Sequence, residues 1–190
     1  MSSATATLRI SGSTSKSFGE TVEEGNPGGE ITFRRGTLED LNAIHDLDKR
    51  IFPPAVAFTP DAFLFLLINP SAVTIVAENH GKFVAFAGME RKSKTEGEVV
   101  TIDVEPELQR HGIGRALMEK LEDEAKLKGY ETLYLQVAEN SEGVVCFYEK
   151  LGYEKTRLMK GYYGRGVNAW EMKKSLKISR QLPPSLEGRG

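Results

Sequence analysis

The stretch that decides the fold is Val104-Glu105-Pro106-Glu107-Leu108-Gln109-Arg110-His111-Gly112-Ile113-Gly114-Arg115-Ala116. A run rich in Val and Ile precedes it, and Pro106 would end the hydrogen-bond ladder of that strand. Gly112 and Gly114 then open a long amphipathic run that Gly129 ends. A strand, a glycine turn and a helix are therefore expected here in succession.

This glycine turn has the features of an anion site. The first N–H groups of a helix have no partner within the helix, and together with the helix dipole they favour a phosphate or pyrophosphate. Arg110 and Arg115 add positive charge at the same place. A Walker loop would need Gly-Lys-Ser/Thr, and a dinucleotide fingerprint would need Gly or Ala where Leu117 stands. The residues alone leave open whether the glycines bind an anion or only shape a tight turn.

Outward from the turn, the apolar residues alternate between the period of a strand and that of a helix. Strands are expected at residues 31–35, 73–78, 83–91, 98–104, 131–137, 153–159 and 169–174. Helices are expected from the N-cap Thr37 to 51, and at 59–68, 112–128 and 143–150. The order β-α-α-β-β-β-α-β-α-β-β predicts an α/β (α+β) fold: a mixed, mostly antiparallel, twisted sheet with helices on both faces.

Composition bounds the class of protein. Of 190 residues, 39% are hydrophobic, and 25 Lys+Arg against 27 Asp+Glu give a formal net charge of −2. This balance excludes a globally basic nucleic-acid binder. The single cysteine excludes an intramolecular disulfide framework, and no apolar run reaches the ~18–20 residues of a membrane span. We therefore expect a cytoplasmic protein that binds neither nucleic acid nor membrane.

The two ends differ from the middle of the chain. Ser, Thr, Gly and Glu dominate residues 1–30, which predicts a flexible N-terminal extension. Residues 177–190 contain Pro183-Pro184 and are expected to form a C-terminal tail. Residues 31–176 remain as one domain.

Further motifs accompany the glycine turn. They are Leu133-Tyr134-Leu135-Gln136-Val137, the run from Cys146 to Tyr153 (CFYEKLGY), and Tyr162-Tyr163 followed by Gly166-Val167-Asn168-Ala169 and Met172. Together with Val-x-Pro-x-x-Gln-Arg-x-Gly-x-Gly-Arg-Ala-Leu, they resemble the GCN5-related N-acetyltransferases, the GNAT superfamily. The last motif and Ile51-Phe52-Pro53 are similar to the RimI-like and N-terminal acetyltransferases. The resemblance covers about residues 31–174.

This resemblance implies that acetyl-CoA binds as co-substrate between a splayed fourth and fifth strand. The backbones of Ile102 and Val104 would pair with its pantetheine arm, and the Val104 N–H would contact the thioester carbonyl. The amides of the glycine turn would hold the pyrophosphate. The residues implied to contact acetyl-CoA are Ile102, Asp103, Val104, Gln109, Arg110, His111, Gly112, Ile113, Gly114, Arg115, Asn140 and Ser141.

Acetyl transfer to an amine needs a proton acceptor for the amine and a proton donor for the leaving thiolate. The resemblance implies that Tyr148 is this general acid, and the alternative is a core tyrosine. Gln136 stands at a base position of the family but cannot accept a proton, so it would orient a water. Spacing places Glu98 where GCN5-like enzymes hold a catalytic glutamate, and alternation puts it on the face of Val100 and Ile102. The alternative for Glu98 is a solvated carboxylate.

Two segments are candidates for binding the acceptor: Phe52-Pro53 in the first inter-helix loop, and Tyr162-Tyr163 near the last hairpin. The tyrosines could hold a peptide backbone or only pack together. Asn168 replaces an aspartate that is usual in this motif. We expect acetylation of a protein N-terminus by direct transfer in a ternary complex. A small-molecule amine or lysine acceptor, a non-catalytic acetyl-CoA sensor, and a monomer or homodimer all stay open.

Other chemistries find little support. The three histidines are scattered without ligand spacing, so no metal is expected. Cys146 lies two residues before Tyr148 and is expected to be a buried core thiol rather than a nucleophile.

Overall fold

The protein was studied as a computed structural model that describes residues 31–52, 57–164 and 166–177. Its elements follow the predicted order and agree with the predicted bounds to within about two residues, apart from the start of the first helix. The strands are β1 (Ile31–Arg35), β2 (Val73–Asn79), β3 (Lys82–Arg91), β4 (Glu96–Val104), β5 (Thr132–Ala138), β6 (Glu154–Met159) and β7 (Ala169–Ser175). The α-helices are α1 (Leu41–Ile51), α2 (Pro60–Ile68), α3 (Ile113–Leu127) and α4 (Glu142–Lys150).

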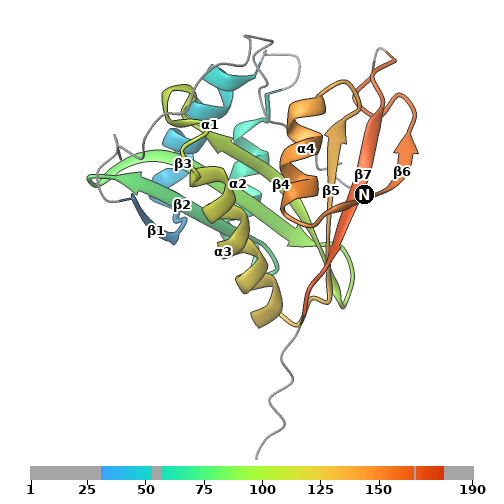
Figure 1. The fold of residues 1–190 in the computed structure, drawn as a ribbon. Coiled ribbons are helices and arrows are strands. Elements are labelled where there is room, and N and C mark those ends of the chain that lie inside the picture. The colour runs from blue at the N-terminus through green and yellow to red at the C-terminus, as the bar shows by residue number, and fades with distance from the viewer. Residues whose placement is uncertain (1–30, 53–56, 165, 178–190) are drawn as a thin grey trace, which may run out of the picture.

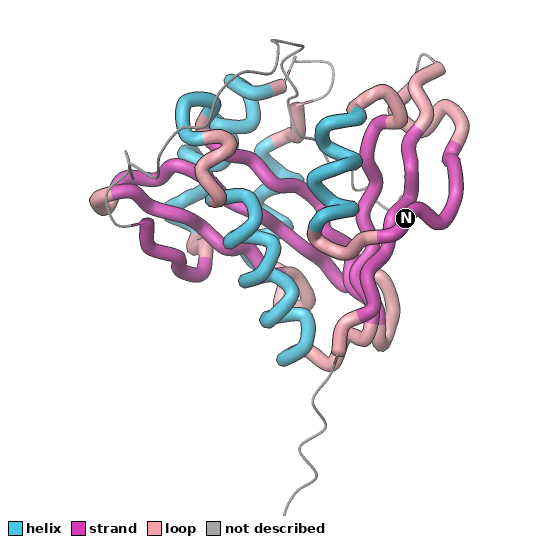
Figure 2. The backbone as a smooth tube through the Cα atoms, in the orientation of Figure 1, coloured by secondary structure: helices cyan, strands magenta, loops and turns pink. Residues whose placement is uncertain are grey.

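All the strands form one sheet with the order β1-β2-β3-β4-β5-β7-β6. Neighbouring strands are antiparallel, except that β4 and β5 are parallel. Helices α3 and α4 cross the front face of this sheet, and α1 and α2 lie behind it (Figure 1, Figure 2). The predicted mixed, mostly antiparallel sheet with helices on both faces is confirmed.

Each face of the sheet has its own apolar core. Leu117 and Leu121 of α3 and Tyr148 of α4 pack against one face and are fully buried. Leu47 of α1 and Phe63 of α2 pack against the other. The helical spacing of these residues places one apolar stripe of each helix toward the sheet, which is what holds the layers together.

A β-bulge interrupts β4 in its middle. Gly88 of β3 pairs with Thr101 and Met89 pairs with Val99, so Val100 is an extra residue. An extra residue breaks the alternation of side chains and increases the local twist. Val100 consequently packs in the α1/α2 core, whereas Ile102 packs in the α3/α4 core. The predicted shared face of Glu98, Val100 and Ile102 is therefore wrong for Ile102.

Beyond the bulge, β4 and β5 separate. The two strands pair only at Glu96–Thr132, Gly97–Leu133 and Glu98–Tyr134. A Cβ atom on Gly97 would lie 2.7 Å from Leu133 Cδ2, so the absence of a side chain permits the close approach at this end. Toward their carboxyl ends the strands run apart, as the predicted splay requires, and a gap opens between them.

Some expectations need correction or lie outside the described residues. Cys146 is exposed rather than buried, because Val145 and Tyr148 occupy the side of α4 that faces the core. The first helix is preceded by a 3-10 turn at Leu38–Asp40, so α1 begins four residues after Thr37. The two predicted tails, apart from Lys177, and the candidate residue Pro53 are not described. Within the described parts of the chain, no helix has the length and apolarity needed to cross a membrane.

Candidate active site

The gap between β4 and β5 exposes backbone groups of β4. The Glu105 N–H bonds the Val84 carbonyl at 2.9 Å, and the alternation of an antiparallel ladder then turns the N–H and C=O of Ile102 and Val104 away from β3. Those groups face the gap toward β5. The Val104 carbonyl accepts the Gln109 side-chain amide at 3.1 Å, so Gln109 braces the glycine turn against β4.

At the end of the gap, the glycine turn leads into α3. Gly112 has a φ of 82°, and Arg110 has a φ of 68°. The first hydrogen bond inside the helix runs from Ala116 N–H to Gly112 C=O at 3.0 Å, and Gly112 offers no side-chain cap. The N–H groups of the first helical turn are therefore directed out of the helix. Exposed Arg110, His111 and Arg115 surround this N-terminus.

Tyr148 of α4 lies inside the protein, in the core between the sheet and helices α3 and α4. Its ring packs edge-on against Phe147 and Tyr153, at centroid distances of 5.0 and 5.7 Å. Its hydroxyl is buried and has no hydrogen-bond partner among the described residues. Burial raises the pKa of Tyr148 well above its ordinary value, and Tyr153, Tyr163 and Asp103 contribute further. The phenol thus stays protonated at neutral pH and can act only as a proton donor.

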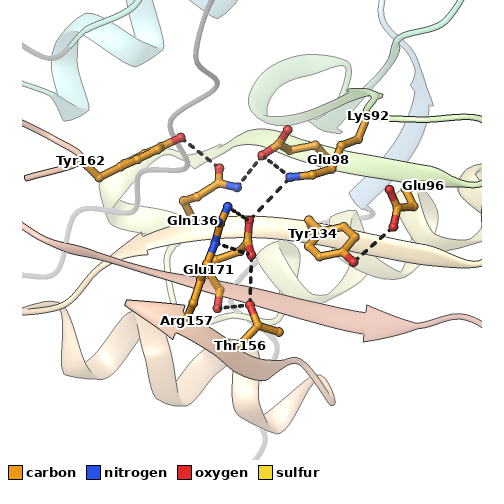
Figure 3. A network of polar contacts seen from close by, with 9 residues as sticks. All are labelled: Lys92, Glu96, Glu98, Tyr134, Gln136, Thr156, Arg157, Tyr162 and Glu171. Atoms are coloured by element: carbon orange, nitrogen blue, oxygen red, sulfur yellow. Dashed lines mark hydrogen bonds and ion pairs between the residues drawn. The ribbon is translucent and has the colours of Figure 1, made fainter. Parts of the chain in front are cut away.

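On the face of the sheet that lies away from α3 and α4, a chain of polar contacts joins three predicted site residues. The Tyr162 hydroxyl lies 3.2 Å from Gln136 Oε1, and Gln136 Nε2 donates to Glu98 Oε1 (Figure 3). Tyr163 donates to the Gln136 backbone carbonyl at 3.2 Å. The β6–β7 turn, β5 and β4 are thereby linked, with Glu98 as the final acceptor. Glu98 is thus a partly buried, hydrogen-bonded carboxylate rather than a freely solvated one.

Sequence reasoning missed several members of this polar network. Glu171 of β7 lies beside Gln136 in register, is 6% exposed, and accepts both Arg157 Nε at 3.0 Å and Arg157 Nη2 at 3.1 Å. Lys92, in the turn after β3, lies near both Glu98 and Glu171. Burial acts to raise the pKa of Glu171, but Arg157, Lys92 and Thr156 together outweigh burial, and the pKa of Glu171 is lowered. The pairing of β5 with β7 creates this network, and no local pattern signals it.

The remaining predicted residues have mixed positions. Asn140 is exposed, and Ser141 caps α4 with its backbone C=O, which accepts the Val144 and Val145 N–H groups. Asp103 is 1% exposed and accepts the Thr101 hydroxyl at 2.9 Å, on the face opposite Ile102. Phe52 is buried at the end of α1.

Asn168 holds the β6–β7 turn. It accepts the Gly161 N–H at 3.0 Å and donates to Glu139 at 2.8 Å. An amide can make both contacts at once, which a carboxylate in its place could not. No group of three or more His, Cys, Asp or Glu suited to a metal occurs in the described parts of the chain.

The chain was compared with known proteins. Residues 41–153 match the model of the acetyltransferase (GNAT) family. The N-alpha-acetyltransferase RimI of Mycobacterium tuberculosis is 30% identical over 148 residues, which cover 76% of this chain and 92% of that protein. The ribosomal protein bS18 alanine N-acetyltransferase of Escherichia coli K12 is 37% identical over 84 residues, which span 56% of that enzyme.

Solved structures agree with these relatives. The crystal structure of the ribosomal-protein-S18-alanine N-acetyltransferase from Escherichia coli superposes with a TM-score of 0.71, at 26% identity, and covers 81% of this chain and 99% of that one. Arabidopsis thaliana NAA60 in complex with acetyl-CoA has the same fold, with a TM-score of 0.68 at 16% identity over 77% of this chain and 99% of that one. The chain therefore belongs to the GNAT family of acetyltransferases and is an N-acetyltransferase related to RimI.

Proposed function

We propose that this N-acetyltransferase uses acetyl-CoA as its acetyl donor and a protein N-terminus as its acceptor. The observation that carries the proposal is the gap between β4 and β5, which has the Glu98 carboxylate at its closed end, together with the buried hydroxyl of Tyr148 on α4. Acetyl transfer to an amine requires a proton donor for the leaving thiolate and a proton acceptor for the amine, and Tyr148 and Glu98 can fill these roles.

The residues present fit acetyl-CoA. An extended arm that carries amides suits the backbone groups of Ile102 and Val104, which face the gap. A pyrophosphate suits the N-terminus of α3, where the N–H groups of the first turn point out of the helix and the exposed Arg110 and Arg115 lie nearby. When bound, acetyl-CoA supplies an acetyl group activated as a thioester.

Protein groups supply the proton transfers. Glu98 takes a proton from the acceptor ammonium, directly or through a water, and Gln136 holds Glu98 in place. The freed amine nitrogen bonds the acetyl carbon as the carbon–sulfur bond breaks. The Val104 N–H donates to the carbonyl oxygen as negative charge develops on it. Tyr148 donates its proton to the departing sulfur. The nitrogen, now bonded to the acetyl carbon, loses its second proton, which restores the Tyr148 phenol directly or through water. Two protons thus leave nitrogen: one balances the proton given to sulfur, and the other passes from Glu98 to solvent.

Two observations favour a protein N-terminus as acceptor. The similar enzymes from Mycobacterium tuberculosis and Escherichia coli are named for the acetylation of α-amines and of an alanine of bS18. In this chain, Tyr162 and Tyr163 anchor the β6–β7 turn to Gln136, directly beside Glu98. An ordered turn of this kind can bind a peptide backbone next to the carboxylate that meets its ammonium.

The test is a comparison of acceptors with acetyl-CoA as donor. One peptide has a free α-amine and no lysine, a second has a blocked α-amine and one lysine, and a polyamine serves as the third acceptor. Because Cys146 is exposed, released CoA should be measured by chromatography rather than with a thiol reagent. We expect turnover with the first peptide only.

The other outcomes separate the alternatives. Turnover with the blocked peptide or the polyamine, but not with the free α-amine, would replace the proposed acceptor. Tight binding of acetyl-CoA without turnover on any amine would indicate a sensor instead of an enzyme.

A further inference from the structure

Lys92 is a charged member of the polar network to which the proposed reaction gives no role. Its Nζ lies 3.4 Å from Glu98 Oε1 and 3.7 Å from Glu171 Oε2. It also lies 4.6 Å from the centroid of the Tyr134 ring (Figure 3). Two carboxylates and an aromatic face hold the ammonium in one position, although the side chain is 29% exposed.

The hydrogen bonds to Glu98 are concentrated on one of its oxygens. Both Lys92 Nζ and Gln136 Nε2 donate to Oε1. In the described parts of the chain, no donor lies within hydrogen-bond distance of Oε2. The carboxylate is therefore held through one oxygen, while the other is available to an ammonium or a water.

Lys92 also balances the charge around Glu98. Glu90 of β3 lies directly opposite Glu98 in register, and its pKa is raised by burial first and by Glu98 second. Arg157 of β6 is engaged with Glu171. Lys92 is thus the one cation among the described residues that contacts Glu98. The titratable and charged groups that face Glu98 are Glu90, Lys92, Glu96, Tyr134, Arg157, Tyr162 and Glu171.

We infer that Lys92 is a positioning residue for the acceptor site, which holds Oε1 of Glu98 with its positive charge so that Oε2 meets the acceptor amine. The inference rests on the proposed role of Glu98 as the proton acceptor. Without Lys92, Glu98 would lie among the carboxylates of Glu90 and Glu171, with only the Gln136 amide as a donor. The Glu98 carboxylate would then hold a proton more tightly.

The test measures kcat/KM for the free-amine peptide across the whole acid limb of the pH profile and onto the plateau above it. In Lys92→Met, we expect the acid limb of the profile to move up by about one pH unit, the effect of losing one ion pair at this distance in a partly solvated site. At pH values below the wild-type limb kcat/KM falls about tenfold, and on the plateau above both limbs the difference disappears. Lys92→Arg should restore most of the profile, and the KM for acetyl-CoA should not change.

Two controls make the result specific. Lys94→Met removes an exposed lysine from the same turn and should reproduce the wild-type profile. Glu98→Gln should lose the acid limb. In the double variant Glu98→Gln/Lys92→Met, kcat/KM should differ from that of Glu98→Gln by less than about twofold, because Lys92 acts through Glu98.

The outcomes distinguish this inference from the proposal beneath it. If Glu98→Gln keeps the wild-type profile, Glu98 is not the proton acceptor and both fail. If Glu98→Gln loses the limb but Lys92→Met lowers the rate equally at every pH, or Lys92→Arg does not restore the profile, only the role of Lys92 is overturned.

Discussion

Replacing Tyr148 with phenylalanine should make the protein more stable and the enzyme slower. The substitution removes one hydroxyl and leaves the ring contacts with Phe147 and Tyr153 in place. A buried hydroxyl without a hydrogen-bond partner costs ~1–3 kcal/mol relative to an apolar group of the same shape. Because the Tyr148 hydroxyl has no partner among the described residues, its removal should stabilise the fold. We expect a gain of about 1 kcal/mol, or roughly 3 °C in Tm for a domain of this size.

The rate should change in the opposite direction. General acid catalysis contributes ~10²–10⁴-fold, and the lower end applies here because a thiolate leaves more readily than an alkoxide or an amide anion. Tyr148→Phe should therefore reduce kcat about 100-fold, with the Kd for acetyl-CoA changed less than about threefold. Differential scanning calorimetry, single-turnover kinetics and isothermal titration measure the three quantities.

Tyr153→Phe is the matched control. Tyr153 is buried in the same aromatic cluster, and its hydroxyl likewise has no hydrogen-bond partner among the described residues, while burial first and Glu122 second raise its pKa. Its removal should therefore raise Tm by a similar amount but should not slow acetyl transfer, because Tyr153 has no role in the proposed reaction. The reasoning is refuted if Tyr148→Phe retains wild-type kcat, or if both substitutions slow the enzyme equally.

Two further substitutions test the glycine turn and the carboxylate pair. Gly112→Ala places a side chain at φ 82° with no atom within 4 Å of its Cβ, so stability should fall ~1–2 kcal/mol and acetyl-CoA should bind more weakly. Gly129→Ala is the control: Gly129 has a φ of 77° beyond the other end of α3, so the substitution should cost similar stability without weakening acetyl-CoA binding. If both variants lose the same affinity for acetyl-CoA, the proposed anion site is contradicted. Glu90→Gln should stabilise the protein in thermal melts at neutral pH but not at acidic pH. Burial and Glu98 raise the pKa of Glu90 in the folded protein. The wild type therefore loses stability as pH rises through that raised pKa, and Glu90→Gln does not. A stability difference between the two proteins that does not change with pH would contradict this.

Local sequence patterns predicted much of the proposed acetyl-CoA side of the site. Pro106 and the Gly112/Gly114 pair predict where β4 ends and α3 begins, because strand ladders cannot use proline and close backbone approach needs glycine. The place of Tyr148 in α4 follows from its motif. Local patterns could not predict that its hydroxyl is buried without a partner, because this depends on how side chains such as Phe147 and Tyr153 pack around it.

On the proposed acceptor side, the sequence predicted some of the residues but not their contacts. Glu98, Gln136 and Tyr162 were each selected separately, and the structure joins them in one chain of contacts. Lys92 and Glu171 were missed, because a lysine in a turn and a glutamate in a strand are ordinary surface residues until β7 pairs with β5. Strand register between distant segments has no local signal.

The amino-acid sequence by itself determined the order of the elements, the faces of the helices and the glycine turn at the start of α3. These features depend on periodicity and on the conformations open to glycine and proline, which act over a few residues. Only the tertiary structure decided that Val100 forms a bulge, that β4 and β5 separate beyond Glu98, and that Lys92 meets the same oxygen as Gln136. The physical reason is that bulges, register and charge pairs are set by partners far apart in the chain, whose positions exist only once both cores have packed.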